Sequence, residues 1–152
     1  MLIFTSSTAV QQDIPVYDFD EFEPVLHRDS DSLYVINFWA TWCKPCVKEL
    51  AYFDQLETQF KGEKIKVILV SLDFEENIET QVKPFLLKKN IRSEVMVMDD
   101  ANSTEWLEKV DPSWSGTIPA TVIYSKKGRS FYEKEFTKEE INKLVRSHLN
   151  KL

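Results

Sequence analysis

Hydrophobic residues recur along the chain with two different spacings, and the changes of spacing mark the predicted elements. Short runs rich in β-branched and aromatic residues predict buried strands, whereas apolar residues three or four positions apart predict helices. Strands are predicted at residues 33–39, 65–72, 94–98, 119–125 and 129–136. Helices are predicted at residues 18–28, 43–60 and 77–89, from about residue 102, and at 137–149. Strands and helices that alternate and then close with a hairpin and a helix predict a layered α/β domain around a mixed sheet.

Prolines and capping residues sharpen the predicted helix ends. Pro45 falls in the first turn of the 43–60 helix, where a missing backbone N–H costs nothing, whereas Pro24 and Pro84 interrupt the helical patterns around them. Asn102 to Glu105 has the composition of a capped helix start, and Thr137 to Glu140 forms a capping box. The apolar stripe of the 43–60 helix is formed by Val47, Leu50, Ala51, Phe53, Leu56 and Phe60.

Length and charge limit the class of protein. The chain has 152 residues, which suits one domain, and its formal net charge of -6 argues against nucleic acid as the main partner. No apolar run approaches the about 20 residues of a membrane-spanning helix. Residues 1–12 are expected to be either a disordered terminus or the remnant of an export signal, because apolar residues there precede small ones without a basic start. Residues 13–152 are then expected to form the domain.

The two cysteines of the chain, Cys43 and Cys46, are separated by two residues. This spacing at a strand-to-helix junction is typical of a dithiol that forms a reversible disulfide. A structural zinc site needs four ligands, and His27 and His148 are distant in sequence and unpaired. We therefore expect a redox pair, with no metal and no cofactor.

The position of the pair at a helix start assigns different roles to the two thiols. Backbone N–H groups and the helix dipole stabilise a thiolate at Cys43, and Lys44 adds a positive charge beside it. In such motifs the thiol pKa falls from about 8.5 to about 3.5–7.5. Cys46 lies one turn further into the helix and is expected to be more buried. Cys43 is therefore the predicted nucleophile, and Cys46 the predicted resolving thiol.

Two segments carry a resemblance to a known family. Asn37-Phe38-Trp39-Ala40-Thr41-Trp42-Cys43-Lys44-Pro45-Cys46, followed by Glu49-Leu50, resembles the active-site segment of the thioredoxin superfamily, and is most similar to its TlpA and ResA type of thiol-disulfide oxidoreductase. Gly116-Thr117-Ile118-Pro119-Ala120-Thr121 resembles the cis-proline loop of that family. The resemblance implies a thioredoxin fold over residues 13–152, a three-layer α/β/α arrangement with a central mixed sheet. It also implies an extra helix and strand inserted at about 77–98.

The resemblance also implies which residues line the site. Pro119 would be a cis-proline that faces the disulfide, and Ile118 would offer its backbone to an extended substrate segment. Trp42, Lys44 and Pro45 would line the site beside the cysteines. Two further tryptophans have open assignments. Trp39 either lines the site or belongs to the core, and Trp114, with Ser115, either contributes to the substrate surface or lies in a connecting loop.

One position departs from the thioredoxin pattern. Thioredoxins carry a buried aspartate two residues before the first tryptophan of this segment, and this chain has Asn37 there. An amide does not take a proton from Cys46, so another acid or a water molecule must do so. Asp73, Glu75 and Glu76 are the predicted candidates, although the two glutamates also fit a solvated loop.

The sequence therefore predicts a thiol-disulfide oxidoreductase that acts as a reductant. The resemblance implies disulfide-bearing protein substrates, apocytochrome c among them, and an upstream thiol reductant such as a membrane electron-transfer protein. It favours a periplasmic or otherwise extracytoplasmic location, with the cytoplasm as the alternative. A non-enzymatic metal or haem-apoprotein chaperone is the alternative function, although related copper carriers use CxxxC. A peroxidase is disfavoured, because the Thr-x-x-Cys setting is absent.

Overall fold

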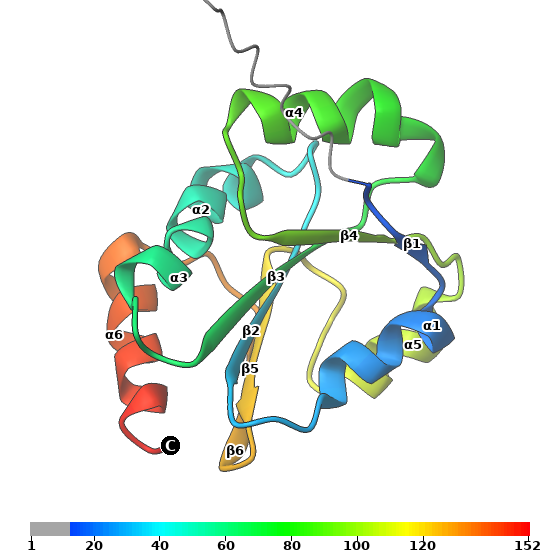
Figure 1. The fold of residues 1–152 in the computed structure, drawn as a ribbon. Helices are drawn as coiled ribbons and strands as arrows, with labels where there is room; N and C mark the ends of the chain where they lie inside the picture. The colour runs from blue at the N-terminus through cyan, green and yellow to red at the C-terminus, as the bar shows by residue number, and fades with distance from the viewer. Residues whose placement is uncertain (1–12) are drawn as a thin grey trace, which may run out of the picture.

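A mixed six-stranded sheet forms the centre of the molecule in a computed structural model that describes residues 13–152 (Figure 1). The strand order is β1-β4-β3-β2-β5-β6. Strands β1, β4, β3 and β2 run parallel to one another. Strand β5 is antiparallel to both of its neighbours, β2 and β6. The strands are β1 Val16–Tyr17, β2 Leu33–Trp39, β3 Ile65–Ser71, β4 Glu94–Met98, β5 Ala120–Ser125 and β6 Gly128–Tyr132.

Helices cover both faces of this sheet (Figure 1). One face carries α2 Lys44–Asp54, α3 Leu56–Gln59, α4 Lys83–Lys88 and α6 Lys138–Leu149. The other face carries α1 Phe19–Phe22, the 3-10 helix Glu23–His27 and α5 Ser103–Val110. The three-layer α/β/α thioredoxin arrangement predicted from the sequence is confirmed, and α4 and β4 occupy the place of the predicted insertion.

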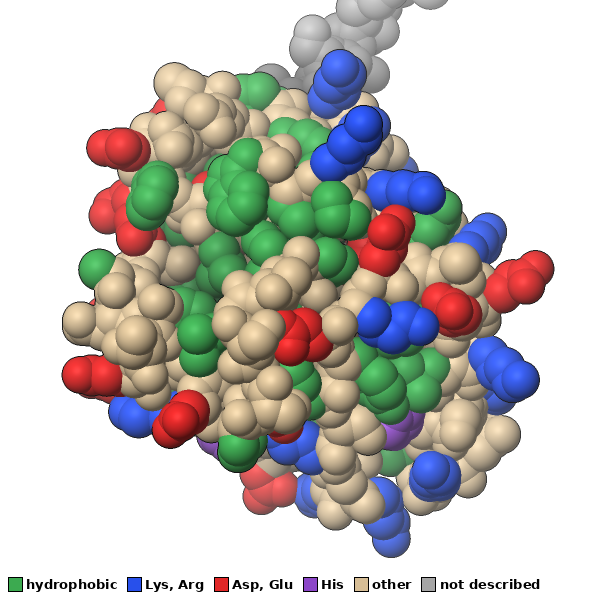
Figure 2. Space-filling model, turned by 180° about the vertical axis from the view of Figure 1, so that it is seen from behind, with side chains coloured by type: hydrophobic (Ala, Val, Ile, Leu, Met, Phe, Trp, Pro, Cys, Tyr) green, Lys and Arg blue, Asp and Glu red, His purple; other side chains and the backbone are tan. Residues whose placement is uncertain are grey.

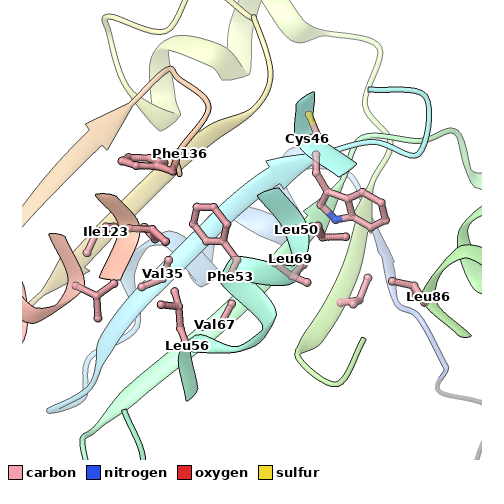
Figure 3. Packing of buried hydrophobic residues seen from close by; sticks show 14 of the residues in the cluster. Val35, Cys46, Leu50, Phe53, Leu56, Val67, Leu69, Leu86, Ile123 and Phe136 are labelled. Carbon is pink, nitrogen blue, oxygen red and sulfur yellow. The ribbon is translucent and has the colours of Figure 1, made fainter. Parts of the chain in front are cut away.

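The core is divided by the sheet into two hydrophobic clusters. Along β2, Val35 and Trp39 point to the cluster under α2 and α6, whereas Ile36 and Phe38 point to the cluster under α1 and α5. Every residue of β2 is buried, as expected for a central strand covered on both faces. Figure 3 shows residues of the first cluster: Cys46, Leu50 and Phe53 from α2 with Val35, Val67, Leu69 and Ile123 from the sheet.

The register between β2 and β5 places two loops side by side. Phe38 pairs with Ala120, so the carboxyl end of β2 lies next to the beginning of β5. The chain that leaves β2 toward α2 therefore meets the chain that enters β5. These are the two segments on which the sequence resemblance rests.

Several element boundaries differ from the prediction. The sequence did not indicate β1, which pairs through Val16 and Tyr17 with the edge of β4. The predicted 43–60 helix is interrupted at Gln55, where Asp54 Oδ1 accepts hydrogen bonds from the backbone N–H groups of Arg92 and Ser93 at 2.9 and 2.8 Å. These bonds fix the end of α2 to the segment that precedes β4.

Prolines account for two further differences. The predicted 18–28 helix divides at Glu23, because Pro24 begins a 3-10 turn. The predicted 77–89 helix is a 3-10 turn, a π-helical turn at Ile78–Val82 and then α4, whose first turn contains Pro84. A proline thus marks the start of a short helix in each case.

The remaining differences concern a cap and a strand end. At α5 the Asn102 side chain makes no capping bond, and its backbone N–H instead donates to Asp100 Oδ1 at 2.8 Å. The last strand ends at Tyr132 rather than at residue 136. The capping box of α6 is present as predicted, with Thr137 Oγ1 accepting from the Glu140 N–H and Glu140 Oε2 accepting from the Thr137 N–H.

Helices in the described part of the chain, residues 13–152, are too short or too polar to cross a membrane. The predictions for residues 1–12 lie outside the described residues.

Phe53→Ala is expected to lower the free energy of unfolding by about 3–5 kcal/mol, because a large side chain is removed from a filled core. Phe53 is fully buried on α2 and its ring lies edge-on to that of Phe136, with centroids 6.1 Å apart. Urea unfolding followed by circular dichroism measures the loss. Thr58→Ala, at an exposed position of α3, is the matched control and is expected to change the value by less than about 0.5 kcal/mol. Equal values for the two variants would contradict this packing.

Candidate active site

Cys43 and Cys46 form a disulfide at the beginning of α2, directly after β2. The two sulfur atoms are 2.08 Å apart and the two Cα atoms 5.2 Å apart. Cys43 is the N-cap residue of α2, and Cys46 lies in its first turn. The side chain of Cys43 is 6% exposed, whereas Cys46 is fully buried. Cys43 is thus the more exposed of the two cysteines, as the sequence predicted.

The loop before β5 lies directly against Cys43. Its Ile118–Pro119 peptide bond is cis, as the family resemblance implied. Cys43 Sγ is 3.7 Å from the carbonyl oxygen of Ile118. Pro119 is buried and Ile118 is half-buried, so the backbone of this loop forms one wall of the site. The structure therefore brings Cys43, Ile118 and Pro119 together.

The residues around the pair form an exposed rim. Trp42 is 66% exposed, and Lys44 and Pro45 are exposed beside it. Phe74, which follows the end of β3, is the other large aromatic side chain that is exposed among residues 13–152. Figure 2 shows that hydrophobic side chains gather in a hollowed area on the face opposite to that of Figure 1.

The two tryptophans with open assignments are both core residues. Trp39 is fully buried and packs on Phe85, with ring centroids 5.4 Å apart. Trp114 is buried and packs on Phe38, with ring centroids 4.8 Å apart. Ser115 is exposed in the loop that precedes the cis-proline.

Asp73 anchors the loop that leads to Cys43. Its carboxylate accepts hydrogen bonds from the backbone N–H of Thr41 at 2.9 Å, from the Thr41 hydroxyl at 2.5 Å and from the Ser71 hydroxyl at 2.6 Å. These three hydrogen bonds tie the Asp73 side chain to Thr41 and Ser71, so it holds the loop before Cys43 in place. Glu75 and Glu76 are exposed and line a surface pocket with Phe74 and Asp99, which fits the solvated-loop alternative.

Glu49 is the buried acid that the sequence analysis did not select. It lies on α2, one turn after Cys46, and its side chain is fully buried. Its Oε1 accepts a hydrogen bond from Asn37 Nδ2 at 3.1 Å, and its Oε2 accepts one from the backbone N–H of Phe136 at 2.7 Å. Asn37 Nδ2 also donates to Thr121 Oγ1 at 3.2 Å. The buried amide thus joins the acid to β5.

Burial raises the pKa of Glu49 from 4.5 to about 7, because the charged carboxylate loses its hydration. The hydrogen bonds from Phe136 and Asn37 lower the pKa, but by less than burial raises it. A carboxyl group with this pKa gains and releases a proton close to neutral pH.

The periodicity of α2 contained a signal for Glu49. Cys46, Glu49, Leu50 and Phe53 are spaced by three, one and three positions, and all four are buried on the inner side of the helix. Ala51, which the sequence analysis placed in the apolar stripe, is exposed, and Val47 is half-buried. A buried stripe that began at Cys46, in the first turn of α2, would have included Glu49.

Metal-ligating side chains do not gather in the part of the chain that the structure describes, where no group of three or more His, Cys, Asp and Glu residues is placed to hold an ion. His27 is exposed after α1, and His148 is half-buried on α6.

Comparison with known proteins gives matches over most of the chain. The model of the AhpC/TSA family matches residues 13–129. The protein named thiol-disulfide oxidoreductase ResA of Bacillus cereus is 33% identical over 110 residues, which cover 70% of this chain and 57% of that protein. The chain thus spans little more than half the length of this relative. The protein of the same name from Geobacillus thermodenitrificans is 27% identical over 152 residues, with 95% of this chain and 82% of that protein covered.

Solved structures share the fold. The thioredoxin-related protein from Neisseria meningitidis serogroup B has a TM-score of 0.64 at 23% identity, with 78% of this chain and 85% of that chain covered. The resemblance to ResA-type proteins, and the thioredoxin fold that it implied, are therefore confirmed.

The raised pKa of Glu49 predicts a pH-dependent stability. Between pH 4.5 and about 7 the folded protein retains a proton that the unfolded chain releases, so the free energy of unfolding falls as pH rises through this range. The fall is on the order of 3 kcal/mol. Glu49→Gln does not titrate, so this component is expected to be absent when urea unfolding is measured from pH 5 to pH 8. A pH dependence that is identical in the two proteins would contradict the assignment.

Proposed function

Because the chain belongs to the AhpC/TSA family, we propose that it is a thiol-disulfide oxidoreductase that exchanges its Cys43–Cys46 dithiol with disulfides of partner proteins. One observation carries the proposal. Cys43 begins α2 and its sulfur lies 3.7 Å from the Ile118 carbonyl, beside cis-Pro119. The reactive thiol and the backbone that would bind an extended substrate thus lie side by side. The name of the Bacillus cereus relative supports the same activity.

The reaction begins at Cys43 of the reduced protein. Its thiolate, stabilised by the N-terminal end of α2, attacks one sulfur of the substrate disulfide. A bond forms between Cys43 Sγ and that sulfur, the substrate S–S bond breaks, and the departing substrate thiolate takes up a proton. Cys43 is now joined to the substrate by a mixed disulfide.

Cys46 then resolves the mixed disulfide. Its thiol loses a proton, the thiolate bonds to Cys43 Sγ, and the mixed disulfide bond breaks. The second substrate sulfur leaves as a thiolate, which takes up a proton. The protein is left with the Cys43–Cys46 disulfide, and two electrons have passed to the substrate. Both cysteines lie within one turn of α2, so this step needs little movement of the backbone.

Glu49 is the proposed acceptor of the Cys46 proton. Residues three positions apart on a helix lie on the same face, with Cβ atoms about 5–6 Å apart. Glu49 and Cys46 are both fully buried on the inner face of α2, and a pKa of about 7 suits proton transfer near neutral pH. Glu49 thereby replaces Asp73, Glu75 and Glu76 as the candidate.

The exposed rim provides the proposed contact with partner proteins. An extended partner segment would pair its backbone with that of Ile118, beside Pro119, and rest on Trp42. Trp42 offers a large apolar surface with few rotatable bonds, and Lys44 and Pro45 complete the rim. The proposed partners are therefore proteins that present a disulfide in an accessible, extended segment.

The proposal includes a direction and a setting. We infer that the protein acts as a reductant, that an upstream dithiol regenerates it, and that it works outside the cytoplasm. Apocytochrome c is one proposed substrate, and a membrane electron-transfer protein is one proposed donor. These finer statements rest on the resemblance of the active-site segment to that of ResA-type proteins.

Cys43→Ser is expected to abolish the reduction of insulin disulfides, because the attacking sulfur is removed. Cys46→Ser is expected to stop after the first attack and to accumulate a mixed disulfide with insulin, which mass spectrometry detects. Turbidity of the released insulin chains measures the reaction of the wild type. Equal background rates for wild type and Cys43→Ser would contradict catalysis.

Glu49→Gln is expected to slow the resolving step by about a hundredfold at neutral pH, the usual lower range for loss of a general base. In a single turnover with an aromatic disulfide, Cys43 releases the first chromophoric thiol and Cys46 the second. Only the second release is expected to slow in the variant and to lose its rise with pH near 7. A second release as fast as in the wild type would exclude Glu49 as the proton acceptor.

A further inference from the structure

Glu133 directly follows β6 and reaches the loop that leads to the cis-proline. Its side chain is half-buried, and β6 is the edge strand beside β5. Its hydrogen bonds go to residues 115 and 117 rather than to Cys43, and the mechanism above assigns it no role. Its carboxylate nevertheless accepts several hydrogen bonds from one short segment, residues 115–117.

Three donors from this segment converge on the Glu133 carboxylate. The Ser115 backbone N–H donates to Oε2 at 3.2 Å, the Thr117 backbone N–H donates to Oε1 at 3.2 Å, and the Ser115 hydroxyl also donates to Oε1. The hydrogen bond from the Ser115 hydroxyl is the main cause that lowers the pKa of Glu133. The group is therefore ionised at neutral pH, and hydrogen bonds to a charged acceptor are the stronger kind.

The same loop is fixed from the inside by Trp114. Its indole Nε1 donates to the Thr117 carbonyl at 2.9 Å, while its buried ring packs on Phe38 and Phe131. Gly116 has a φ of +98°, which glycine adopts without strain, and an added Cβ would lie 3.3 Å from Leu107. The indole and the carboxylate thus both hold the loop directly before Ile118.

We propose that Glu133 is a positioning residue that holds residues 115–117 so that the backbone of Ile118 stays against Cys43 and open to an extended peptide. This inference rests on the proposed function, since it concerns the binding of a peptide disulfide to that site. Its effect passes through the loop, because Glu133 touches residues 115 and 117 rather than the sulfur atoms. Loss of Glu133 should therefore weaken binding of peptide substrates and leave the chemistry of Cys43 unchanged.

The test compares how fast the reduced 152-residue protein reduces two different disulfides. Insulin has a peptide backbone that can pair with the loop, whereas 2-hydroxyethyl disulfide has none. Glu133→Ala is expected to raise the KM for insulin about tenfold or more, because charge-assisted hydrogen bonds that order the loop are lost. The rate constant with 2-hydroxyethyl disulfide is expected to stay within about twofold. Glu133→Gln keeps the oxygen that serves Thr117, and its KM for insulin is expected to rise only about threefold.

Glu108→Ala is the matched control, because it removes the same charge from an exposed position on α5. It is expected to behave as wild type with both disulfides. A Glu133→Ala protein with an unchanged KM for insulin, or with equal losses on both disulfides, would overturn the proposal. If Glu133→Ala fails to fold by circular dichroism, Glu133→Gln decides by the same comparison. A wild type inactive on both disulfides would instead contradict the proposed function itself.

Discussion

The contact between the first turn of α2 and the loop that ends in Pro119 is the constraint on which the site depends. It exists because β2 and β5 pair with Phe38 opposite Ala120, which brings the end of one strand beside the beginning of the other. Cys43 then lies 3.7 Å from the Ile118 carbonyl. A shift of this register by one residue would turn one strand over relative to the other and displace the two walls of the site. The buried central sheet is thus what holds the thiol and the substrate wall together.

Two buried carboxylates near the site have different surroundings. Asp73 receives three hydrogen bonds from Thr41 and Ser71, which suits a permanent anchor for the loop before Cys43. Glu49 receives one bond from Asn37 and one from the Phe136 N–H, and otherwise lies against an apolar cluster that raises its pKa to about 7. Asp73 therefore anchors a loop, whereas Glu49 gains and releases a proton close to neutral pH.

Sequence patterns predicted the elements whose signals are local. The strands at 33–39 and 94–98 and the capping box at Thr137 were found where expected, because burial on both faces and capping leave direct traces in the sequence. β1 was missed because two residues acquire strand geometry only by pairing with the distant β4. Glu49 was missed because a glutamate on an amphipathic helix is usually solvated, and only its spacing from Cys46 distinguishes it.

The reduction potential of the Cys43–Cys46 pair is the measurement that tests the central claim most directly. The protein is equilibrated with defined ratios of reduced and oxidised glutathione, quenched with an alkylating agent and analysed by mass spectrometry. A reversible two-electron transition at about -270 mV, the value of thioredoxin, is the result expected for a reductant. A potential near about -120 mV would identify an oxidant, and the absence of any reversible transition would contradict a redox role for the pair.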